Sequence, residues 1–322
     1  MSLTLDQVYA AQKRISSIAT RTPLKRSLSL TQRLGRPVSL KMETMQGSGA
    51  FKLRGAVNSI LSLPPEVQSR GVVTASSGNH GRAVAYVAKE LGIPSIICLS
   101  ELVPPSKVGA IESLGGEALV GGKDQDAAMV VAHDIAASRG MTYIGPFDEL
   151  DVIAGQATIG LEILEDNPDV DTLVVQVSGG GLMAGVAFAV KSLKPSVRII
   201  GITMERGAAM YHSIKAGKPV NVEELSTVAD ALQGGICLDN RFTFDLCQTY
   251  VDDFMLISER QIKDAMSYAF HNERLVLEGS GACGIGLLLS DQIKDLGNNV
   301  VTVCSGDNVD LDSFLEIVTQ KT

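Results

Sequence analysis

The chain has 322 residues, of which 45% are hydrophobic and 20% are charged, and its formal net charge at pH 7 is −8. This length suits two domains, and the acidic balance, without any cluster of lysine and arginine, argues against a nucleic-acid partner. No apolar run approaches the ~20 residues that span a bilayer, and the N-terminus lacks the basic and apolar segments of a signal peptide, so we expect a cytoplasmic protein with no membrane partner.

Aromatic residues make up only 4% of the chain and tryptophan is absent, so we expect an aliphatic core. The five cysteines are scattered and form no C-x-x-C pair, which argues against a disulfide scaffold. Two of them, Cys98 and Cys304, lie in apolar runs typical of strands, and we expect buried, reduced thiols there. The four histidines lack the spacing of a zinc-binding helix, so we predict no metal site.

The first predicted elements are an amphipathic helix, a break and a strand. Apolar residues recur at helical spacing over residues 5–18, residues 21–24 interrupt the pattern with a proline, and residues 38–43 alternate like a strand. A glycine-bounded turn, residues 48–56, then leads into an apolar helix that ends before two prolines. This turn contains a single lysine, Lys52.

Lys52 has two interpretations. The simpler one is a solvated surface residue at a helix start, because lysines are mostly exposed. Alternatively, burial and the nearby helix N-terminus keep the amine poor in charge, so that it can react with an aldehyde. The turn alone leaves both open, and loops elsewhere in the chain must decide between them.

Strands and helices alternate along the rest of the chain. The predicted strands are nearly continuous apolar runs, which are typical of a parallel sheet covered on both faces. We predict strands at 71–75, 95–99, 118–120, 173–177, 198–202 and 300–304. We predict helices at 83–91, 108–114, 124–138, 152–164, 183–190, 258–272, 281–295 and the C-terminal end, with a less regular stretch at 204–257.

This alternation predicts an α/β protein of two domains, each an open, mostly parallel sheet flanked by helices. We expect a small domain of residues 47–145, which holds Lys52, and a large domain of residues 1–46 and 146–322. Three distinctive loops, beginning at Ser76, Ser178 and Ser305, directly follow predicted strands. Because ligands of open α/β sheets bind at the carboxyl ends of strands, loops from both domains should face one cleft.

The loop Ser178-Gly179-Gly180-Gly181 separates a buried strand from a helix. Backbone without side chains can approach an anion closely, and the helix N-terminus supplies free N–H groups, so a phosphate fits there. A tight turn without a ligand is the simpler alternative. The segment also matches the G-x-G-x-x-A pattern of dinucleotide sites, but Ile202 and Thr203 stand at the strand end where that motif wants an acid.

The other two loops are polar turns between a strand and a helix. Residues 76–81, with the letters SSGNHG, offer hydroxyls, an amide and clustered N–H groups, which suit a carboxylate. Residues 305–308 repeat the arrangement after the last strand. For both loops the simpler alternative is capping of the helix that follows.

Taken together, these motifs resemble those of the serine/threonine dehydratase and serine racemase family, which are pyridoxal-phosphate enzymes of fold type II with the tryptophan-synthase-β fold. The resemblance covers nearly the whole chain in the family's order and spacing. It is carried by KME at 41–43, FKLRGA at 51–56, SGNHG at 77–81, GQ at 155–156, SGGG at 178–181 and SG at 305–306. Residues 145–148 and 203–210 further resemble the hydroxyectoine-utilisation dehydratases.

The resemblance implies that Lys52 holds pyridoxal phosphate through its amine and exchanges the substrate's α-proton. It implies that the triple glycine cradles the phosphate and that Asn79 contacts the ring hydroxyl. It also implies that Ser305 meets the pyridine nitrogen, where a serine makes a weaker electron sink than an aspartate and so favours elimination. The implied cofactor-binding residues are Phe51, Lys52, Asn79, Ser178, Gly179, Gly180, Gly181, Leu182, Glu278 and Ser305.

The same resemblance implies a substrate-carboxylate site at the start of the 76–81 loop. Its residues are Ser76, Ser77, Gly78, Asn79 and His80. Ser77 lies where the racemases place an acid or base on the opposite face of the cofactor ring, so it is a second catalytic candidate beside Lys52.

Several positions depart from the family pattern. Ala50 stands where a serine is usual, and Asp307 where a glycine is common. Thr203 and Ala209 occupy the positions of the racemase metal ligands, so we predict no racemase-type Mg²⁺ site. Two arginines, Arg82 and Arg206, are candidates for a second polar or anionic substrate group or, equally, are solvated side chains.

The leading hypothesis is a lyase that removes water, then ammonia, from a β-hydroxy α-amino acid, with hydroxyectoine catabolism as its setting. An amino-acid racemase with the same cofactor is the first alternative. A non-catalytic nucleotide or amino-acid sensor that uses the same loops is the second. We expect the protein to be a homodimer. We expect its small-molecule partner to be an amino-acid substrate.

Overall fold

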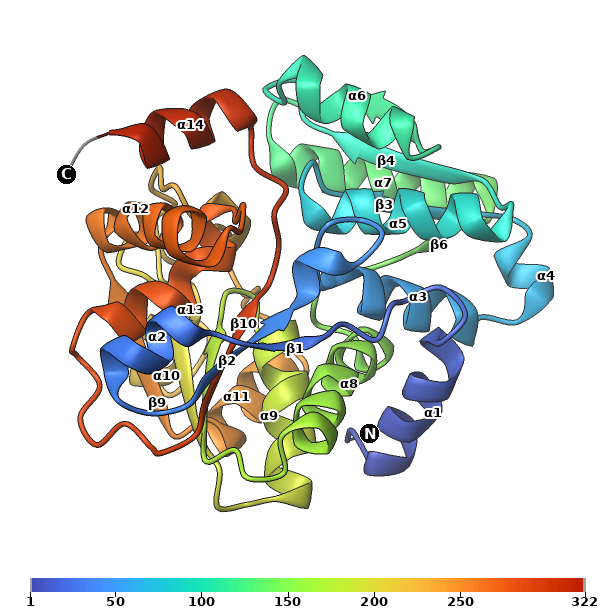
Figure 1. Ribbon diagram of the computed structural model, residues 1–322. Helices are drawn as coiled ribbons and strands as arrows, with labels where there is room; N and C mark the ends of the chain where they lie inside the picture. The colour runs from blue at the N-terminus through green and yellow to red at the C-terminus, as the bar shows by residue number, and fades with distance from the viewer. Residues whose placement is uncertain (1, 321–322) are drawn as a thin grey trace.

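The computed structural model describes residues 2–320, which form two lobes, each built on its own sheet (Figure 1). The larger sheet has six strands in the order β1-β2-β10-β7-β8-β9. Only β1 runs antiparallel to its neighbour, and all other neighbouring pairs are parallel. The bounds are β1 Leu24–Arg26, β2 Val38–Met42, β7 Thr172–Gln176, β8 Arg198–Met204, β9 Asp253–Ile257 and β10 Val300–Cys304.

The smaller sheet has four parallel strands in the order β5-β4-β3-β6. Their bounds are β3 Val72–Ala75, β4 Ser95–Leu99, β5 Glu117–Val120 and β6 Thr142–Tyr143. All four lie between residues 72 and 143. We therefore keep residues 47–145 as the proposed small domain. The predicted fold class, two mostly parallel sheets flanked by helices, is confirmed.

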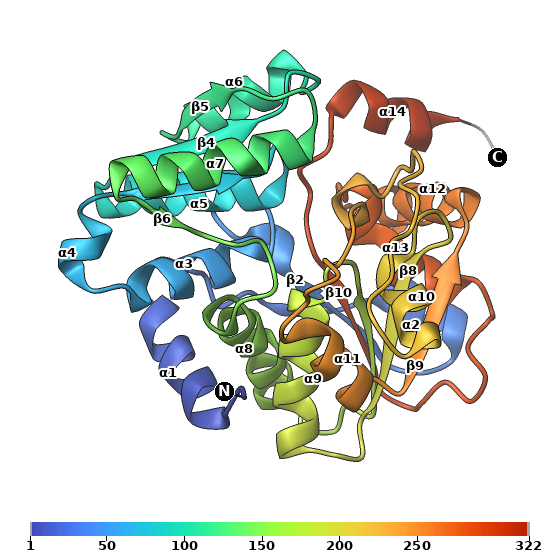
Figure 2. The same cartoon turned by 180° about the vertical axis from the view of Figure 1, so that it is seen from behind.

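Helices cover both faces of each sheet (Figures 1 and 2). Alternate residues of one strand enter different cores: Leu173 and Val175 of β7 join one cluster, while Val174 joins another. The α-helices are α1 Leu5–Ile15, α2 Leu28–Leu34, α3 Lys52–Ser62, α4 Pro65–Gln68, α5 Asn79–Leu91, α6 Pro105–Ser113, α7 Gln125–Arg139, α8 Leu150–Asp166, α9 Gly181–Leu193, α10 Ala209–Ala216, α11 Thr243–Tyr250, α12 Glu259–Tyr268, α13 Gly279–Leu289 and α14 Leu311–Thr319.

Different groups of helices cover the two faces of each sheet. In the large lobe α8 and α9 pack with α1 and α11 on one face, and α13 packs on the other face with α12. In the small lobe α5 contributes to the core on one face and α7 covers the other. Helix α3 contacts both α5 and α8, so the helix that begins at Lys52 joins the two lobes. The core is aliphatic, as predicted.

Several predicted boundaries were wrong by a few residues. Helix α1 ends at Ile15 rather than at 18, and the helix predicted at 258–272 changes at Tyr268 into a π-helical turn, Ala269–Glu273. Arg274, in the left-handed conformation with φ 61°, ends that turn. Cys98 and Cys304 are buried free thiols, as predicted. Among residues 2–320, no helix combines the length and apolar character needed to cross a bilayer.

Candidate active site

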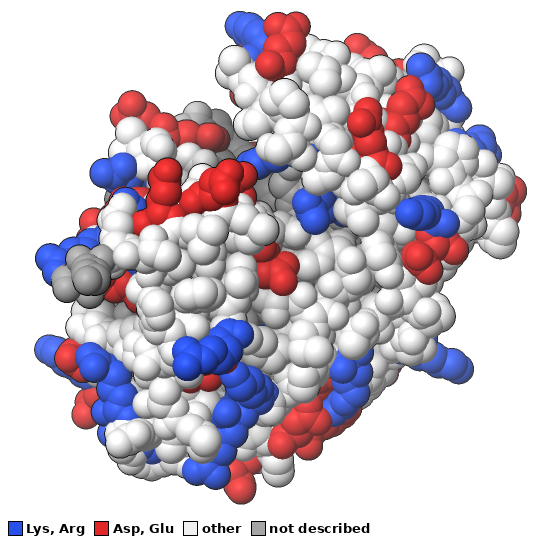
Figure 3. All heavy atoms as spheres, turned by 45° about the horizontal axis from the view of Figure 1, so that its top comes forward, with Lys and Arg blue, Asp and Glu red and all other residues white. Residues whose placement is uncertain are grey.

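Loops from the carboxyl ends of parallel strands meet between the two lobes, where the surface is indented (Figure 3). Strand β3 ends at Ala75 before the turn that starts α5, and β7 ends at Gln176 before the glycine turn that starts α9. Strand β10 ends at Cys304 before the polar loop that leads to α14. These are the three loops in which the sequence predicted a binding function.

The lysine turn is hydrogen-bonded to the loop after β10. The Phe51 N–H donates to the Ser305 carbonyl at 3.0 Å, and the Asp307 N–H donates to the Gly49 carbonyl at 3.0 Å. Between these bonds, Ala50 forms an antiparallel bridge with Gly306. The start of α3 is therefore fixed against Ser305, which is buried.

A buried network of side chains joins this loop to the start of α5. The Asn79 amide donates to Glu278 Oε1 at 2.8 Å, and the Asn308 amide donates to Asn79 Oδ1 at 2.7 Å and to the Ser48 carbonyl at 2.8 Å. Burial raises the pKa of Glu278 to about 8. Asn79, Glu278 and the lysine turn are thus brought together from three distant parts of the chain.

The Lys52 amine is desolvated. It donates to the Pro146 carbonyl at 2.5 Å and lies 5.4 Å from the centre of the Phe51 ring. Burial lowers its pKa from the ordinary 10.5 to about 8, because the charged form loses its hydration. The half-buried side chain and the lowered pKa favour the reactive amine over the solvated surface lysine, because a larger fraction of the amine is uncharged and nucleophilic at neutral pH.

This shift predicts the pH dependence of aldehyde capture by the apoprotein. The rate of Lys52 modification by pyridoxal phosphate should rise about tenfold per pH unit below pH 8 and level off above it, since only the neutral amine reacts. Stopped-flow absorbance of cofactor-free protein between pH 6 and 10 measures this profile. A rise that continues unchanged to pH 10 would show an ordinary lysine.

The triple glycine lies next to the Pro146-Phe147 segment, whose Pro146 carbonyl accepts the hydrogen bond from Lys52. A Cβ on Gly179 would stand 2.5 Å from the Phe147 ring, and one on Gly181 would stand 3.0 Å from Phe147 Cα. Pro146, whose carbonyl accepts from Lys52, immediately precedes this phenylalanine. Gly180 has φ +93°, which only glycine adopts readily. The backbone N–H groups at the start of the 13-residue helix α9 are thus free of side chains and lie close to the Pro146-Phe147 segment, to which Lys52 is hydrogen-bonded.

A side chain at Gly179 should damage this site. Replacing Gly179 by alanine places a methyl group against the Phe147 ring, and the resulting overpacking should weaken pyridoxal-phosphate affinity by ~10- to 100-fold. Equilibrium dialysis of the cofactor measures the effect. Gly109→Ala in α6 is the matched control, because its Cβ meets nothing within 4 Å, and it should leave affinity unchanged. Equal losses in both variants would contradict the assignment.

The turn before α5 is not a simple helix cap. The N-cap residue is Gly78, and no side chain caps the helix there. Ser76 Oγ instead accepts from the Gly78 N–H at 3.3 Å. Within residues 2–320, the Ser77 hydroxyl forms no hydrogen bond. The capping interpretation is also wrong for residues 305–308, because Asp310 caps α14 through the Ser313 N–H.

His80 is a neutral, buried imidazole in this turn. Its Nε2 lies 3.0 Å from the Ile144 carbonyl, and burial together with the Lys52 charge lowers its pKa to about 3. Its Nδ1 is buried and finds no hydrogen-bond partner within residues 2–320. The same holds for the hydroxyls of Ser48 and Ser280, near the lysine turn and Glu278. Unsatisfied buried polar atoms at one place indicate a missing polar ligand.

A buried ionic cluster lies behind the lysine helix. Arg54 donates to Glu43 at 2.8 Å and to Glu162 at 2.6 Å, and Lys41 also pairs with Glu162. Arg54 is only 1% exposed, so all these charges are compensated inside the protein. The cluster connects β2, α3 and α8 and fixes the position of the helix that begins with Lys52.

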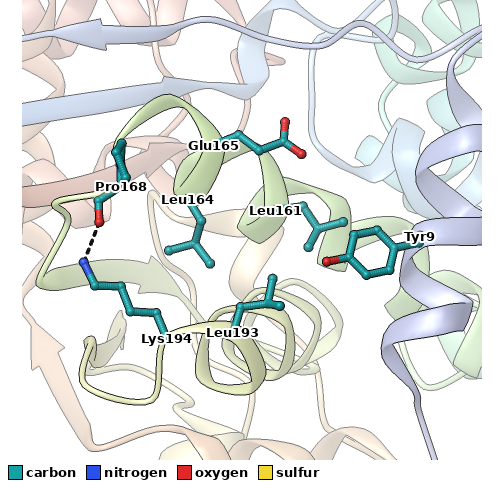
Figure 4. A pocket seen from close by; sticks show the side chains of 7 residues that line it. All are labelled: Tyr9, Leu161, Leu164, Glu165, Pro168, Leu193 and Lys194. Atoms are coloured by element: carbon teal, nitrogen blue, oxygen red, sulfur yellow. Dashed lines mark hydrogen bonds between the residues drawn. The ribbon is translucent and has the colours of Figure 1, made fainter.

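A separate pocket of about 330 Å³ lies between α1, α8 and α9 (Figure 4). Its two charged groups are already engaged: the Lys194 amine donates to the Pro168 and Val170 carbonyls, and Glu165 pairs with Arg21. It contains no group suited to the chemistry discussed above.

The residues at the cleft fit pyridoxal phosphate. The desolvated Lys52 amine suits its aldehyde, and the side-chain-free N-terminus of α9 suits its phosphate. Asn79, Glu278 and Ser305 are buried beside the lysine turn, where polar ring atoms need partners. Sequence reasoning overlooked Asn308 and the Pro146 carbonyl, although both stand in segments that it singled out.

Comparison with known proteins supports this fit. The sequence matches the family described as "Pyridoxal-phosphate dependent enzyme" over residues 15–306. It is 48% identical to a putative threonine dehydratase of Sinorhizobium fredii over 98% of this chain and 96% of that protein. It is 38% identical to the L-threonine ammonia-lyase of Thermotoga maritima over 99% of this chain and 79% of that protein.

Solved structures agree. Maize serine racemase superposes with a TM-score of 0.93 at 35% identity, covering 98% of this chain and 97% of that chain. Threonine deaminase isoform 2 from Solanum lycopersicum superposes with a TM-score of 0.89 at 34% identity, covering 99% and 94%. The protein therefore belongs to the family of pyridoxal-phosphate dependent enzymes and is similar over its whole length to threonine dehydratases.

Proposed function

We propose that the protein is a dehydratase that converts a β-hydroxy α-amino acid, such as threonine or serine, into a 2-oxo acid and ammonia. The observation that carries this proposal is the desolvated Lys52 amine on the Pro146 carbonyl, together with the triple glycine that packs on the adjoining Phe147. Whole-length similarity to threonine dehydratases and ammonia-lyases supports the reaction type.

Lys52 holds the cofactor and then acts as the base at the substrate's α-carbon. Bound pyridoxal phosphate withdraws electrons from that carbon and makes its proton acidic. With a pKa lowered by burial, the amine can accept the α-proton at neutral to slightly alkaline pH. Loss of the β-hydroxyl as water leaves an enamine, which hydrolyses in solution to the 2-oxo acid and ammonia.

The turn before α5 holds the substrate's α-carboxylate. Ser76, Ser77, Gly78, Asn79 and His80 supply hydroxyls, an amide and N–H groups at the N-terminus of a 13-residue helix. Since His80 is neutral over the physiological pH range, this carboxylate is bound by hydrogen bonds and the helix dipole rather than by a histidine cation. Ser77 is the proposed acid or base on the opposite side of the cofactor.

The remaining site residues position the cofactor. We propose that Ser178, Gly179, Gly180, Gly181 and Leu182 hold the phosphate, that Phe51 packs on the ring, and that Asn79 and Ser305 bind polar ring atoms. Glu278 holds the Asn79 amide at 2.8 Å and so fixes the side of Asn79 that faces the ring.

The test is turnover of candidate substrates. Purified holoenzyme should release ammonia and a 2-oxo acid in equal amounts from L-threonine or L-serine, measured by coupled assays. Binding of L-threonine or L-serine without any release of ammonia would favour the amino-acid sensor. Conversion of L-serine to D-serine, faster than ammonia release and measured by chiral chromatography, would favour the racemase.

The racemase alternative has one structural argument on each side. Ser77 stands in the turn before α5, where the charge of Lys52 acts on His80, and it is the residue that this reaction would use. At the positions where the racemases place their metal ligands, however, Thr203 and Ala209 are buried and lack carboxylates. Within residues 2–320, no group of three or more His, Cys, Asp or Glu side chains could hold a metal ion.

We further propose a role in hydroxyectoine utilisation, as a cytoplasmic homodimer. The resemblance of residues 145–148 supports this role, because that segment contributes the Pro146 carbonyl to Lys52 and the Phe147 ring to the glycine turn. Ring-opened derivatives of hydroxyectoine that are β-hydroxy α-amino acids should then be turned over faster than threonine. Sedimentation velocity tests the dimer.

A further inference from the structure

The two candidate arginines differ in their surroundings. Arg206 is exposed, and its guanidinium donates to the Ser226 carbonyl at 2.8 Å. Arg82, on the second turn of α5, is half-buried, and its Nε is enclosed. This Nε has no hydrogen-bond partner within residues 2–320, and no carboxylate of those residues forms an ion pair with the guanidinium. A partly desolvated guanidinium without a partner is costly, which points to a ligand.

Arg82 lies on the cleft side of α5. Asn79, three residues earlier and therefore on the same face of the helix, contacts Glu278 and Asn308 across the cleft. Asp307 and Glu278, both on the opposite wall, raise the pKa of Arg82 against the effect of its burial, Asp307 more than Glu278. Arg82 therefore shares with Asn79 the face of α5 that is turned toward Glu278 and the loop after β10.

We propose that Arg82 is a specificity-determining residue that binds a second carboxylate of the substrate, so that the preferred substrate is a C4 β-hydroxy amino dicarboxylate, a 3-hydroxyaspartate. This inference rests on the proposed dehydratase function. An α-helix rises ~1.5 Å per residue, so Arg82 is ~4.5 Å along the axis from Asn79. A C4 dicarboxylate can span that interval, with one carboxylate in the turn before α5 and the other on Arg82.

Asp307 separates two possible roles of Arg82, binding of the substrate and pairing with Asp307 itself. It is half-buried on the opposite wall, and burial raises its pKa to about 6 although Arg82 opposes the shift. At pH 7.5 its carboxylate repels a second substrate carboxylate. If Arg82 serves the substrate, Asp307→Asn should strengthen dicarboxylate binding. If Arg82 instead closes the cleft by pairing with Asp307, removing either partner should have the same effect.

The first experiment measures binding without turnover. Isothermal titration of holoenzyme at pH 7.5 compares succinate with butyrate, which has the same carbon number and one carboxylate. We expect succinate to bind ~10- to 100-fold more tightly, Arg82→Gln to remove the difference, and Arg82→Lys to restore part of it. Arg206→Gln is the matched control and should keep the wild-type preference. Absence of a succinate preference in the wild type, or equal weakening by Arg82→Gln and Asp307→Asn, would overturn the proposal.

The second experiment separates this inference from the proposed function. Arg82→Gln should lower kcat/KM for 3-hydroxyaspartate ~10- to 100-fold relative to serine. Equal losses for both amino acids would overturn the specificity role. If neither amino acid releases ammonia while the succinate preference and its loss in Arg82→Gln persist, the dehydratase proposal fails and the dicarboxylate site stands.

Discussion

Replacement of Lys52 by alanine is expected to abolish covalent cofactor binding and to lower ammonia release by ~10³-fold or more. The variant removes both the amine that captures the aldehyde and the base at the α-carbon, and a positioned base alone contributes ~10²- to 10⁴-fold. Wild-type protein should be yellow and remain so after dialysis, whereas Lys52→Ala should become colourless. Absorbance spectra and the coupled ammonia assay measure both effects.

Lys89→Ala provides the matched control for this prediction. Lys89 lies on α5 and is exposed, and its amine donates a hydrogen bond to the Ser113 carbonyl. Its loss should change neither colour nor turnover. A Lys52→Ala protein that folds, stays yellow after dialysis and keeps more than a tenth of wild-type activity would show that another amine performs both tasks.

Replacement of Arg54 by methionine is expected to cost ~3–5 kcal/mol of folding free energy. The buried carboxylates of Glu43 and Glu162 would lose the guanidinium that compensates them, and an unpaired buried charge is far more costly than a missing surface pair. The midpoint of urea unfolding, followed by circular dichroism, measures the loss. Cofactor affinity should fall as well, because the cluster positions α3.

Arg21→Ala is the control for the ionic cluster. Arg21 pairs with Glu165 and Asp166 on the surface, where both partners of the Glu165 pair are 48% exposed at the side chain. Such pairs contribute ~0–1 kcal/mol, so the unfolding midpoint should barely move. Similar losses in the two variants would mean that burial of Arg54 adds nothing to its interactions.

The strands that sequence analysis located best are those whose local pattern needs no tertiary information. β4 and β10 are uninterrupted runs of apolar residues and were placed at their observed bounds. β1 has three residues at one edge of the sheet, and β9, at the other edge, is a short apolar run after Asp253 that is mostly half-buried. Both were missed: β1 is too short to show a pattern, and β9 lies in the stretch 204–257, where strands and helices do not alternate regularly.

The candidate site was predictable as a set of loops but not as a set of contacts. Glycines and polar residues after apolar strands marked the loops at which we propose that ligands bind, since that rule depends on local sequence alone. The bridge between Ala50 and Gly306 and the bond from Lys52 to the Pro146 carbonyl depend on the packing of distant segments. A backbone carbonyl carries no residue-type signal, so its role becomes visible only in three dimensions.

Peptide mapping after borohydride reduction tests the central claim most directly. Reduction of the yellow holoenzyme fixes the cofactor to the amine that it occupies, and mass spectrometry of the digest then locates the added mass. We predict that the mass is found on Lys52 and that the Gly179→Ala variant carries less of it. Full labelling of any other lysine, with Lys52 unmodified, would contradict the assignment of this cleft as the active site.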